Sequence, residues 1–182
     1  MKRRPRRLPD RVQPGVRVLF VGINPGIRSA AIGHHFAGYS NRFWKLLYDS
    51  GLVPEPLTCE QDVRLPEWGY GLTNVAARPT RGIDELTAAD YAAGWRRLRA
   101  KIRRLRPRVV VLVGVTLATI LRKRTRKAAE RSTPVRVGLQ PFDLAGARLF
   151  VLPNPSGRNA NFSYAEMLAA FRALKRALDG MP

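Results

Sequence analysis

The sequence predicts an α/β fold of three layers, α/β/α, with helices on both faces of a central, mainly parallel sheet of four strands. Two observations predict it. Short apolar runs alternate along the chain with longer segments whose apolar residues recur at helical spacing. The run VVVLV at 109–113 is apolar at every position, which is typical of a central parallel strand buried on both faces.

The first half of the chain alternates between strand and helix. An apolar run predicts a strand at 16–21, and the segment YGLTNV predicts the next strand at 70–75. Between these strands we expect a long loop, a helix at 40–50 that ends at Gly51, and a proline-broken stretch at 53–68.

The next helix runs from Thr87 to Leu105, because Thr87 and Asp90 form a capping pattern ahead of an apolar stripe. We interpret the arginines on its other faces as a solvated surface. They are Arg96, Arg97, Arg99, Arg103 and Arg104. Beyond the apolar strand, residues 115–121 predict a further helix that leads into a basic stretch.

The last part of the chain contains the fourth strand and the final helix. The segment 130–146 is polar and rich in proline and glycine, with a minor strand expected near Val135. The fourth strand is predicted at 148–152, and a helix follows that begins with a capping box at Ser163.

Charge and length indicate one domain with a nucleic-acid ligand. Lys and Arg number 33 against 13 Asp and Glu, a net charge of +20, and a charge of this size attracts polyanions. A chain of 182 residues is long enough for a single well-packed domain, which we place at 14–182. Residues 1–13 carry six basic residues and are predicted to form a disordered arm.

Other classes of protein are disfavoured by the same composition. The single cysteine, Cys59, excludes an internal disulfide framework and a four-cysteine metal site. No apolar stretch approaches the length of a membrane span, and the amino terminus lacks the core of a signal peptide. We therefore expect a cytoplasmic, monomeric protein without membrane contact.

Three loops follow the carboxyl ends of predicted parallel strands, and such loops meet at one edge of a sheet. They are GINPG at 22–26, TNVAARPT at 73–80 and NPSGRNANF at 154–162. These loops hold no carboxylate pair, nucleophile elbow or phosphate-binding motif. His34 and His35 are adjacent, and they lack the neighbours that a metal site needs, so we expect no metal and no cofactor.

Asn24 is the first candidate residue in these loops. It lies in a turn whose glycines and proline expose main-chain N–H groups. Its amide can donate and accept hydrogen bonds but cannot take a proton at neutral pH. Such a side chain suits a reaction in which water is aimed rather than strongly activated.

The motifs GINPG, GHHFAGYSNRFW, GLTN and NPSG together resemble the mismatch-specific uracil-DNA glycosylases and the related thymine-DNA glycosylases. The resemblance covers roughly residues 16–178. It implies the uracil-DNA glycosylase fold, a substrate of double-stranded DNA that contains uracil or a mismatch, and hydrolysis of the N-glycosidic bond of a flipped base. No cofactor is implied.

The resemblance also implies roles for single residues. Asn24 matches the catalytic residue that orients water, and Phe36 matches the aromatic ring that stacks on the flipped base. The backbone near Ile23 and Phe36 would read the uracil edge, and Ser29 would set the tolerance for a group on C5. Asn74 matches the polar pocket residue of the thymine-specific branch; the bacterial mismatch enzymes have Lys there.

The loop after the fourth strand matches the DNA wedge of the thymine-specific branch, in which an arginine fills the gap left by the flipped base. We expect Arg158 to be this wedge and Ser156, Gly157 and Asn159 to contact DNA phosphates nearby. In the bacterial branch a leucine takes the wedge position, so the preferred base is left open. Flipping needs both phosphate contacts and an inserted side chain, because unstacking costs a few kcal/mol.

Alternatives remain at this stage. Asn24 could satisfy its own turn, Phe36 could anchor a loop, and Arg158 could be a plain phosphate contact. Asn74 could cap the following turn. At the level of function, the chain could prefer deaminated purines such as hypoxanthine or xanthine, or it could be a catalytically silent DNA-binding module.

Overall fold

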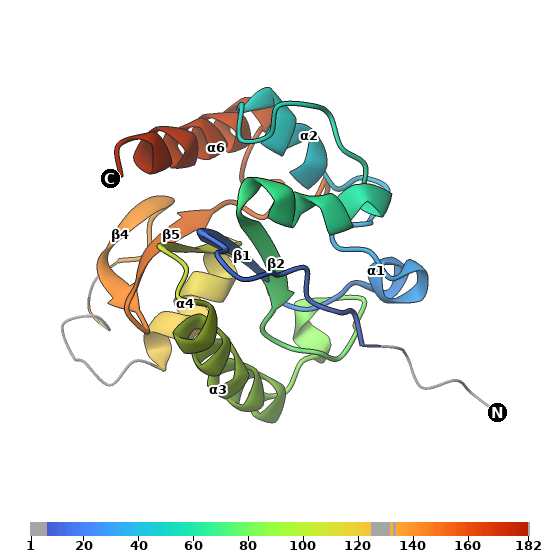
Figure 1. The fold of residues 1–182 in the computed structure, drawn as a ribbon. Coiled ribbons are helices and arrows are strands. Elements are labelled where there is room, and N and C mark those ends of the chain that lie inside the picture. Colours follow the sequence, from blue (N-terminus) through green and yellow to red (C-terminus); the bar gives the residue numbers. More distant parts are fainter. Residues whose placement is uncertain (1–6, 125–131, 133, 182) are drawn as a thin grey trace.

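A computed structural model of the protein, which describes residues 7–124, 132 and 134–181, contains a central sheet between two layers of helices (Figure 1). The strands are β1 (Val18–Gly22), β2 (Tyr70–Asn74), β3 (Val109–Val113), β4 (Gly138–Leu144) and β5 (Ala147–Leu152). Their order across the sheet is β2-β1-β3-β5-β4. All neighbours pair in parallel except β4 and β5, so the predicted α/β class is confirmed.

The sheet has five strands, and the prediction of four was wrong. The additional strand, β4, begins at Gly138, whereas a minor strand was expected near Val135. It pairs antiparallel with β5 at the edge of the sheet, and the turn at Ala145 and Gly146 joins the two strands. Its pairing is irregular between Leu139 and Asp143, on either side of Pro141. A proline, an irregular register, and a buried Gln140 next to an exposed Leu139 remove the alternating pattern by which a strand is recognised.

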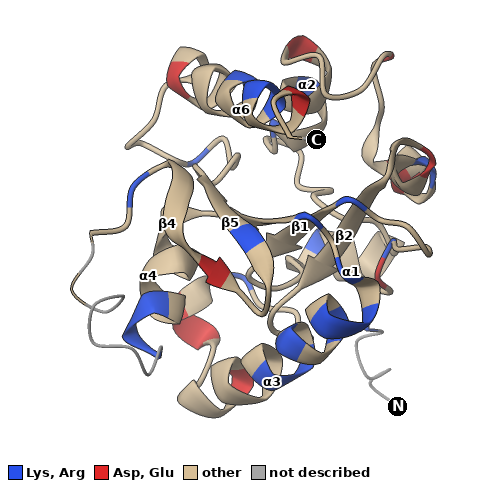
Figure 2. Ribbon diagram, turned by 60° about the vertical axis from the view of Figure 1, so that its left-hand side comes forward, with Lys and Arg blue, Asp and Glu red and all other residues tan. Residues whose placement is uncertain are grey.

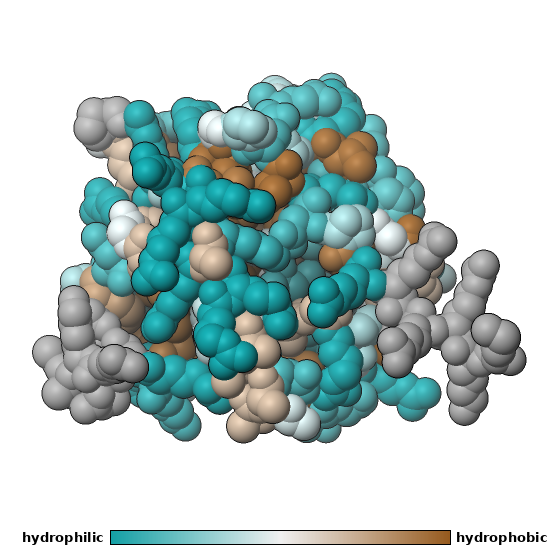
Figure 3. All heavy atoms as spheres, turned by 60° about the horizontal axis from the view of Figure 1, so that its bottom comes forward, coloured by the Kyte–Doolittle hydropathy of each residue, from teal (hydrophilic) through white to brown (hydrophobic). Residues whose placement is uncertain are grey.

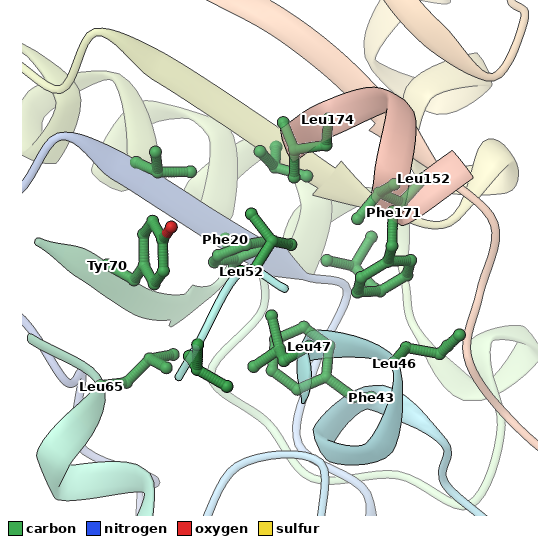
Figure 4. Packing of buried hydrophobic residues seen from close by; sticks show 14 of the residues in the cluster. Phe20, Phe43, Leu46, Leu47, Leu52, Leu65, Tyr70, Leu152, Phe171 and Leu174 are labelled. Carbon is green, nitrogen blue, oxygen red and sulfur yellow. The ribbon is translucent and has the colours of Figure 1, made fainter. Parts of the chain in front are cut away.

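Helices cover both faces of the sheet, as the three-layer prediction requires (Figure 1). Strand β1 supplies both sides, since Val18 and Phe20 point to one hydrophobic cluster and Leu19 and Val21 to the other. The first cluster is closed by α2 (Phe43–Asp49) and α6 (Tyr164–Asp179). In Figure 4 the rings of Phe20, Phe43 and Phe171 pack together between the sheet and these helices.

The second cluster is closed by α3 (Ala88–Leu105) and α4 (Val115–Lys123). The predicted capping box is present, because Thr87 accepts from the Asp90 N–H and the Asp90 carboxylate accepts from the Thr87 N–H. At Gly94 the helix lies so close to the sheet that a Cβ atom would be 2.4 Å from the Val75 carbonyl oxygen. Glycine therefore sets how closely α3 approaches the end of β2.

Three shorter segments were not predicted from the sequence. They are α1 (Ile27–Ile32) and the 3₁₀ segments η1 (Cys59–Trp68) and η2 (Ile83–Glu85). Each lies in a stretch that the periodicity assigns to loops. The segments α1 and η2 are too short to establish an apolar stripe, and η1 contains Pro66. No helix in the described part of the chain is long and apolar enough to cross a membrane.

Residues 7–13 pack on the domain, although the composition predicts that they belong to a disordered arm. The backbone of Arg11 exchanges two hydrogen bonds with Leu72, at 2.9 and 2.8 Å. Asp10 accepts from Thr73 at 2.6 Å and pairs with Lys101 at 2.6 Å. Strand-like pairing and ion pairs replace the apolar burial that this segment lacks. Residues 1–6 lie outside the described part of the chain.

Candidate active site at the carboxyl edge of the sheet

The carboxyl ends of the parallel strands meet beside β1, where the connections of the sheet change direction. The chain leaves β1 for β2 on one side, whereas β3 lies on the other side and leads on to β5. In open α/β sheets, this switch point is where a crevice forms and ligands bind. The loops after β1, β2 and β5 all begin here, as the sequence predicts.

A cavity of about 210 Å³ opens at this point. The predicted catalytic residue and all four predicted base-pocket residues line it: Ile23, Asn24, Ser29, Phe36 and Asn74. Segments far apart in sequence therefore converge on one space.

The Asn24 side chain is held by one end of its amide. Its Nδ2 donates to the carbonyl oxygens of Pro25 and Arg78, each at 3.1 Å, and to Thr80 Oγ1 at 2.7 Å. Carbonyl oxygens only accept, so the nitrogen must face this loop. The opposite end, Oδ1, is then the end that can accept a hydrogen bond from a molecule in the cavity.

The hydrogen bonds of Asn24 also support part of the alternative interpretation, in which its side chain stabilises its own turn. By joining Arg78 and Thr80 to the GINPG turn, its amide holds together the loops after β1 and β2. Thr80 extends this link, since its hydroxyl donates to the Gly82 carbonyl at 2.6 Å. Asn24 therefore has a structural role through Nδ2, and a role toward a ligand is open to Oδ1.

Phe36 forms a flat platform in the cavity. Its ring stacks on Phe43, with the centroids 4.0 Å apart and the planes at 21°. One face of the ring is covered in this way, so the other face is the one that a planar ligand can use. The backbone of Phe36 has φ 51°, a left-handed conformation that costs a non-glycine residue of order 1–3 kcal/mol. Backbone strain of this kind concentrates at ligand sites.

Asn74 reaches over Gly22, its register partner in β1. A Cβ atom at Gly22 would be 2.4 Å from Asn74 Oδ1 and 3.7 Å from the Phe36 ring. The first glycine of GINPG is therefore needed to admit the amide. This contact places a donor and an acceptor of Asn74 beside the aromatic platform.

Ser29 and Ile23 contribute mainly through the backbone. Ser29 is buried, and its hydroxyl accepts from the Ala37 N–H at 3.0 Å, which fixes the chain just after Phe36. Ile23 packs its side chain toward the cluster beneath α3, and its carbonyl accepts from the Ala76 N–H at 2.8 Å. The structure brings both residues to the cavity.

A buried carboxylate behind the cavity holds three segments together. Asp62, on η1, has no exposed surface. Its Oδ1 lies 2.9 Å from Arg11 Nε and 3.0 Å from His34 Nδ1, and its Oδ2 accepts from the His35 N–H at 2.8 Å. Asp62 thus fixes the residues that lead directly into Phe36. The sequence analysis missed it, because its partners come from distant parts of the chain.

His35 is a further residue of the cavity that the sequence analysis did not assign there. Burial lowers the pKa of its imidazole, so the ring is neutral near pH 7. In the neutral ring, Nε2 lies 2.9 Å from the Pro9 carbonyl, which only accepts, so the proton is on Nε2. The ring therefore ties residues 7–13 to the wall of the cavity.

The predicted wedge loop is held in place largely by its own polar groups. Asn154 Oδ1 accepts from the Ser156 N–H at 3.1 Å, and the Asn159 amide donates to the Asn154 carbonyl at 2.9 Å. The Arg158 N–H donates to Ser156 Oγ at 3.2 Å, while the Arg158 side chain is exposed. Ser156 and Asn159 thus have clear structural roles, and Arg158 is presented at the surface.

The wedge loop also packs against the chain that precedes α2. The Arg42 N–H donates to the Pro155 carbonyl at 2.9 Å, and a Cβ atom at Gly157 would be 2.6 Å from Ser40 Cβ. A groove of about 370 Å³ is lined by the loop and shares Asn154 with the cavity at the switch point. Asn154 therefore connects the two spaces. Its place directly after a strand was a signal for it, although the sequence analysis did not single it out.

Comparison with known proteins identifies the family. A model of the Uracil DNA glycosylase superfamily matches residues 9–176. The chain belongs to the uracil DNA glycosylase superfamily. Membership supports a DNA glycosylase, a hydrolase that acts on N-glycosidic bonds in DNA, and it implies a DNA substrate.

A solved structure agrees with this assignment at the level of the fold. It is a solution NMR structure of a protein from Methanosarcina acetivorans that is named "putative Uracil DNA glycosylase". The two chains align with a TM-score of 0.59 and 19% sequence identity, over 94% of this chain and 98% of the other. At this identity the likeness concerns the fold alone.

Replacing Asp62 with asparagine should destabilise the protein. The change removes the charge that Arg11 pairs with, and breaking a buried ion pair from one side costs on the order of 3 kcal/mol. Urea unfolding of Asp62→Asn and wild type measures this loss of free energy of unfolding. Asp143→Asn, at an exposed position, is the matched control and should change it by less than about 0.5 kcal/mol. Equal effects of both variants would show that Asp62 does not organise this region.

Proposed function

We propose that the protein is a monofunctional DNA glycosylase that acts as a monomer on double-stranded DNA. It removes uracil, including uracil in G:U mismatches, and other damaged bases. It would flip the nucleotide out of the duplex and so initiate base excision repair. One observation carries the proposal: Asn24, Phe36 and Asn74 line the same cavity at the switch point of the sheet. The GINPG and NPSG motifs favour the mismatch-specific and thymine-DNA glycosylase branch.

In this proposal the base lies on the Phe36 ring, whose other face is already covered by Phe43. The Asn74 amide, held above Gly22, pairs with the polar edge of the base. An amide offers both a donor and an acceptor, so it can match the carbonyl and the N–H of a uracil edge. A stacked and paired base is aligned with its glycosidic bond toward the loop that carries Asn24.

The chemistry proceeds without a strong base. Asn24 Oδ1 accepts a hydrogen bond from a water molecule and aims it at C1′ of the sugar. As the C–N bond breaks, its electron pair leaves with the base, and the water oxygen forms the new bond to C1′. The proton that this water loses passes to solvent or to the departing base. No aspartate or glutamate is among the residues that line the cavity. Because a general base adds about 10²–10⁴-fold, turnover should be slow.

Stabilisation of the leaving base would come from fixed dipoles. The GINPG turn and the Phe36 turn both place backbone at the wall of the cavity. N–H groups that are aimed in advance at developing negative charge lower the barrier without a reorganisation step. The negative charge on a departing uracil is therefore the feature that this site would recognise most strongly.

The function is tested by base release from a panel of duplexes that differ in one base. Uracil opposite guanine or adenine, hypoxanthine and xanthine are incubated with excess protein, and abasic sites are cleaved with alkali. Release of uracil supports the proposal. Release confined to hypoxanthine or xanthine would assign a different base preference, and no release from any duplex, with binding intact, would identify a catalytically silent module.

Asn24→Ala should retain DNA binding and lose base release by about 100-fold or more, the loss typical when one preorganised polar group is removed from a reacting centre. Single-turnover rates on a uracil duplex, together with the dissociation constant for the same duplex, measure the two effects separately.

A matched variant, Thr80→Val, distinguishes the water-aiming role from the structural one. It removes one partner of Asn24 Nδ2 and leaves Oδ1 in place. If Asn24 acts only by joining the two loops, both variants lose activity and binding in parallel. If Oδ1 aims water, Thr80→Val keeps most of the rate.

Arg158→Ala should reduce base release more strongly on uracil opposite adenine than on uracil opposite guanine. A side chain that fills the gap in the stack matters most where flipping is costly, and flipping from a mismatch costs less. A plain phosphate contact predicts the same loss on both duplexes. The ratio of single-turnover rates on the two substrates decides it, and an unchanged ratio would remove Arg158 from the flipping step.

A further inference from the structure

A second concentration of positive charge lies at the edge of the sheet opposite the candidate site. Arg17 immediately precedes β1, Arg108 immediately precedes β3, and Arg148 is near the start of β5. The three backbones are joined directly, since the Arg108 N–H donates to the Arg17 carbonyl at 2.8 Å and the Arg148 N–H to the Arg108 carbonyl at 3.0 Å. Neighbouring strands lie about 4.8 Å apart, so these positions span roughly 10 Å.

The end of α3 brings further arginines to this edge, because Arg106 is two residues before Arg108. We define the amino-edge patch as six exposed arginines, namely Arg17, Arg103, Arg104, Arg106, Arg108 and Arg148. In Figure 2, basic positions follow the outer side of α3 and recur on β5 in the same view. The patch belongs to the opposite ends of the strands from Asn24 and Asn74.

The charge on α3 is not balanced within the helix. Asp90, in the first turn, is its one acidic residue, and it pairs with Arg78. Within the described residues, no ion pair links Arg103 or Arg104 to a carboxylate. Arg99 and Arg103 lie four residues apart in α3, so their like charges repel along one side of the helix. A polyanion would relieve this repulsion.

The patch fits a phosphate backbone better than a protein. The exposed large hydrophobic residues of the described chain include none in α3 or at the starts of β1, β3 and β5. Hydrophilic residues cover most of the face seen in Figure 3, on the side that carries α3. Protein interfaces are centred on apolar or aromatic anchors, whereas nucleic-acid surfaces are polar and strongly positive. Arginine also matches phosphate oxygens with two parallel donors.

The edge is also hollowed, which suits a rounded backbone. A cavity of about 490 Å³ lies beside the patch; Arg17, Arg108 and Lys175 line it, together with the acidic Glu67 and Asp179 and with apolar and aromatic residues. Lys175 pairs with Asp179 at 2.7 Å.

We propose that the amino-edge patch is a second nucleic-acid surface, which binds the phosphate backbone of a second duplex while the first duplex occupies the candidate active site. One protein molecule would then bridge two DNA segments. This inference revises the interpretation of the α3 arginines as a solvated face, and it goes beyond the proposed glycosylase function because it needs no base release.

Bridging is tested with two undamaged duplexes, one biotinylated and one fluorescent. The full chain should carry the fluorescent duplex onto streptavidin beads. The triple variant Arg103→Gln, Arg104→Gln, Arg148→Gln should reduce this capture about tenfold or more, and should lower the slope of log affinity against log salt for the second duplex by about 2 to 3.

The matched control removes the same charge elsewhere, by Lys123→Gln, Arg136→Gln and Arg172→Gln, three exposed positions outside the patch. It should retain capture, and thermal unfolding should show that both triple variants fold. Equal losses in the two triple variants, or no capture by wild type, would overturn the proposal. The proposal would also be overturned if polyglutamate competed with the fluorescent duplex as effectively as unlabelled duplex does, because an acidic protein would then be the better partner.

Sedimentation separates bridging by one molecule from bridging by a protein dimer. The expected complex contains one chain and two duplexes, and a complex of two chains and two duplexes would contradict the proposal. Base release from a single uracil duplex should be unchanged in the patch variant. If bridging fails, the glycosylase proposal therefore still stands. If no base is released, bridging can still be measured, because it is assayed with undamaged duplexes.

Discussion

The buried Asp62 carboxylate is the interaction on which the geometry of the candidate site depends. A charge without exposed surface is tolerated only where donors surround it, and here the donors come from residues 11, 34 and 35. These contacts fix the turn that holds Phe36 and bring residues 7–13 alongside the cavity, where Leu8 forms part of the wall. The Asp62 carboxylate thus fixes the chain that leads into the platform and adds to the contacts that hold residues 7–13.

A few local contacts also position the polar groups on the opposite wall of the cavity. Asn24 joins the loops after β1 and β2, and Gly22 makes room for the Asn74 amide. Each polar group of the cavity is therefore positioned by a neighbour that reaches it across the edge of the sheet. The parallel strands supply the convergence, and these local bonds supply the orientation, which is the division of roles expected of a preorganised site.

Much of the fold could be predicted where the signal is local. The apolar run of β3 and the capping boxes of α3 and α6 are complete within short windows of sequence, and each was placed within a few residues. Strand β4 was missed because its order comes from pairing with β5 rather than from its own pattern. The cavity residues were found through motif resemblance, whereas Asp62, His35 and Asn154 depend on contacts between distant segments, which a single sequence does not reveal.

The wedge loop has a consequence for the search for damage. Its hydrogen bonds, from Asn154 through Ser156 to Asn159, and its close packing on Ser40 are all formed in the free protein. Ordering of the loop therefore belongs to folding and is not repeated at each encounter with DNA. Under the proposed function, this arrangement would help a protein that must inspect very many intact base pairs for each altered one. Each inspection would begin with Arg158 already presented, so the time spent per site would be set by the opening of the DNA rather than by the loop.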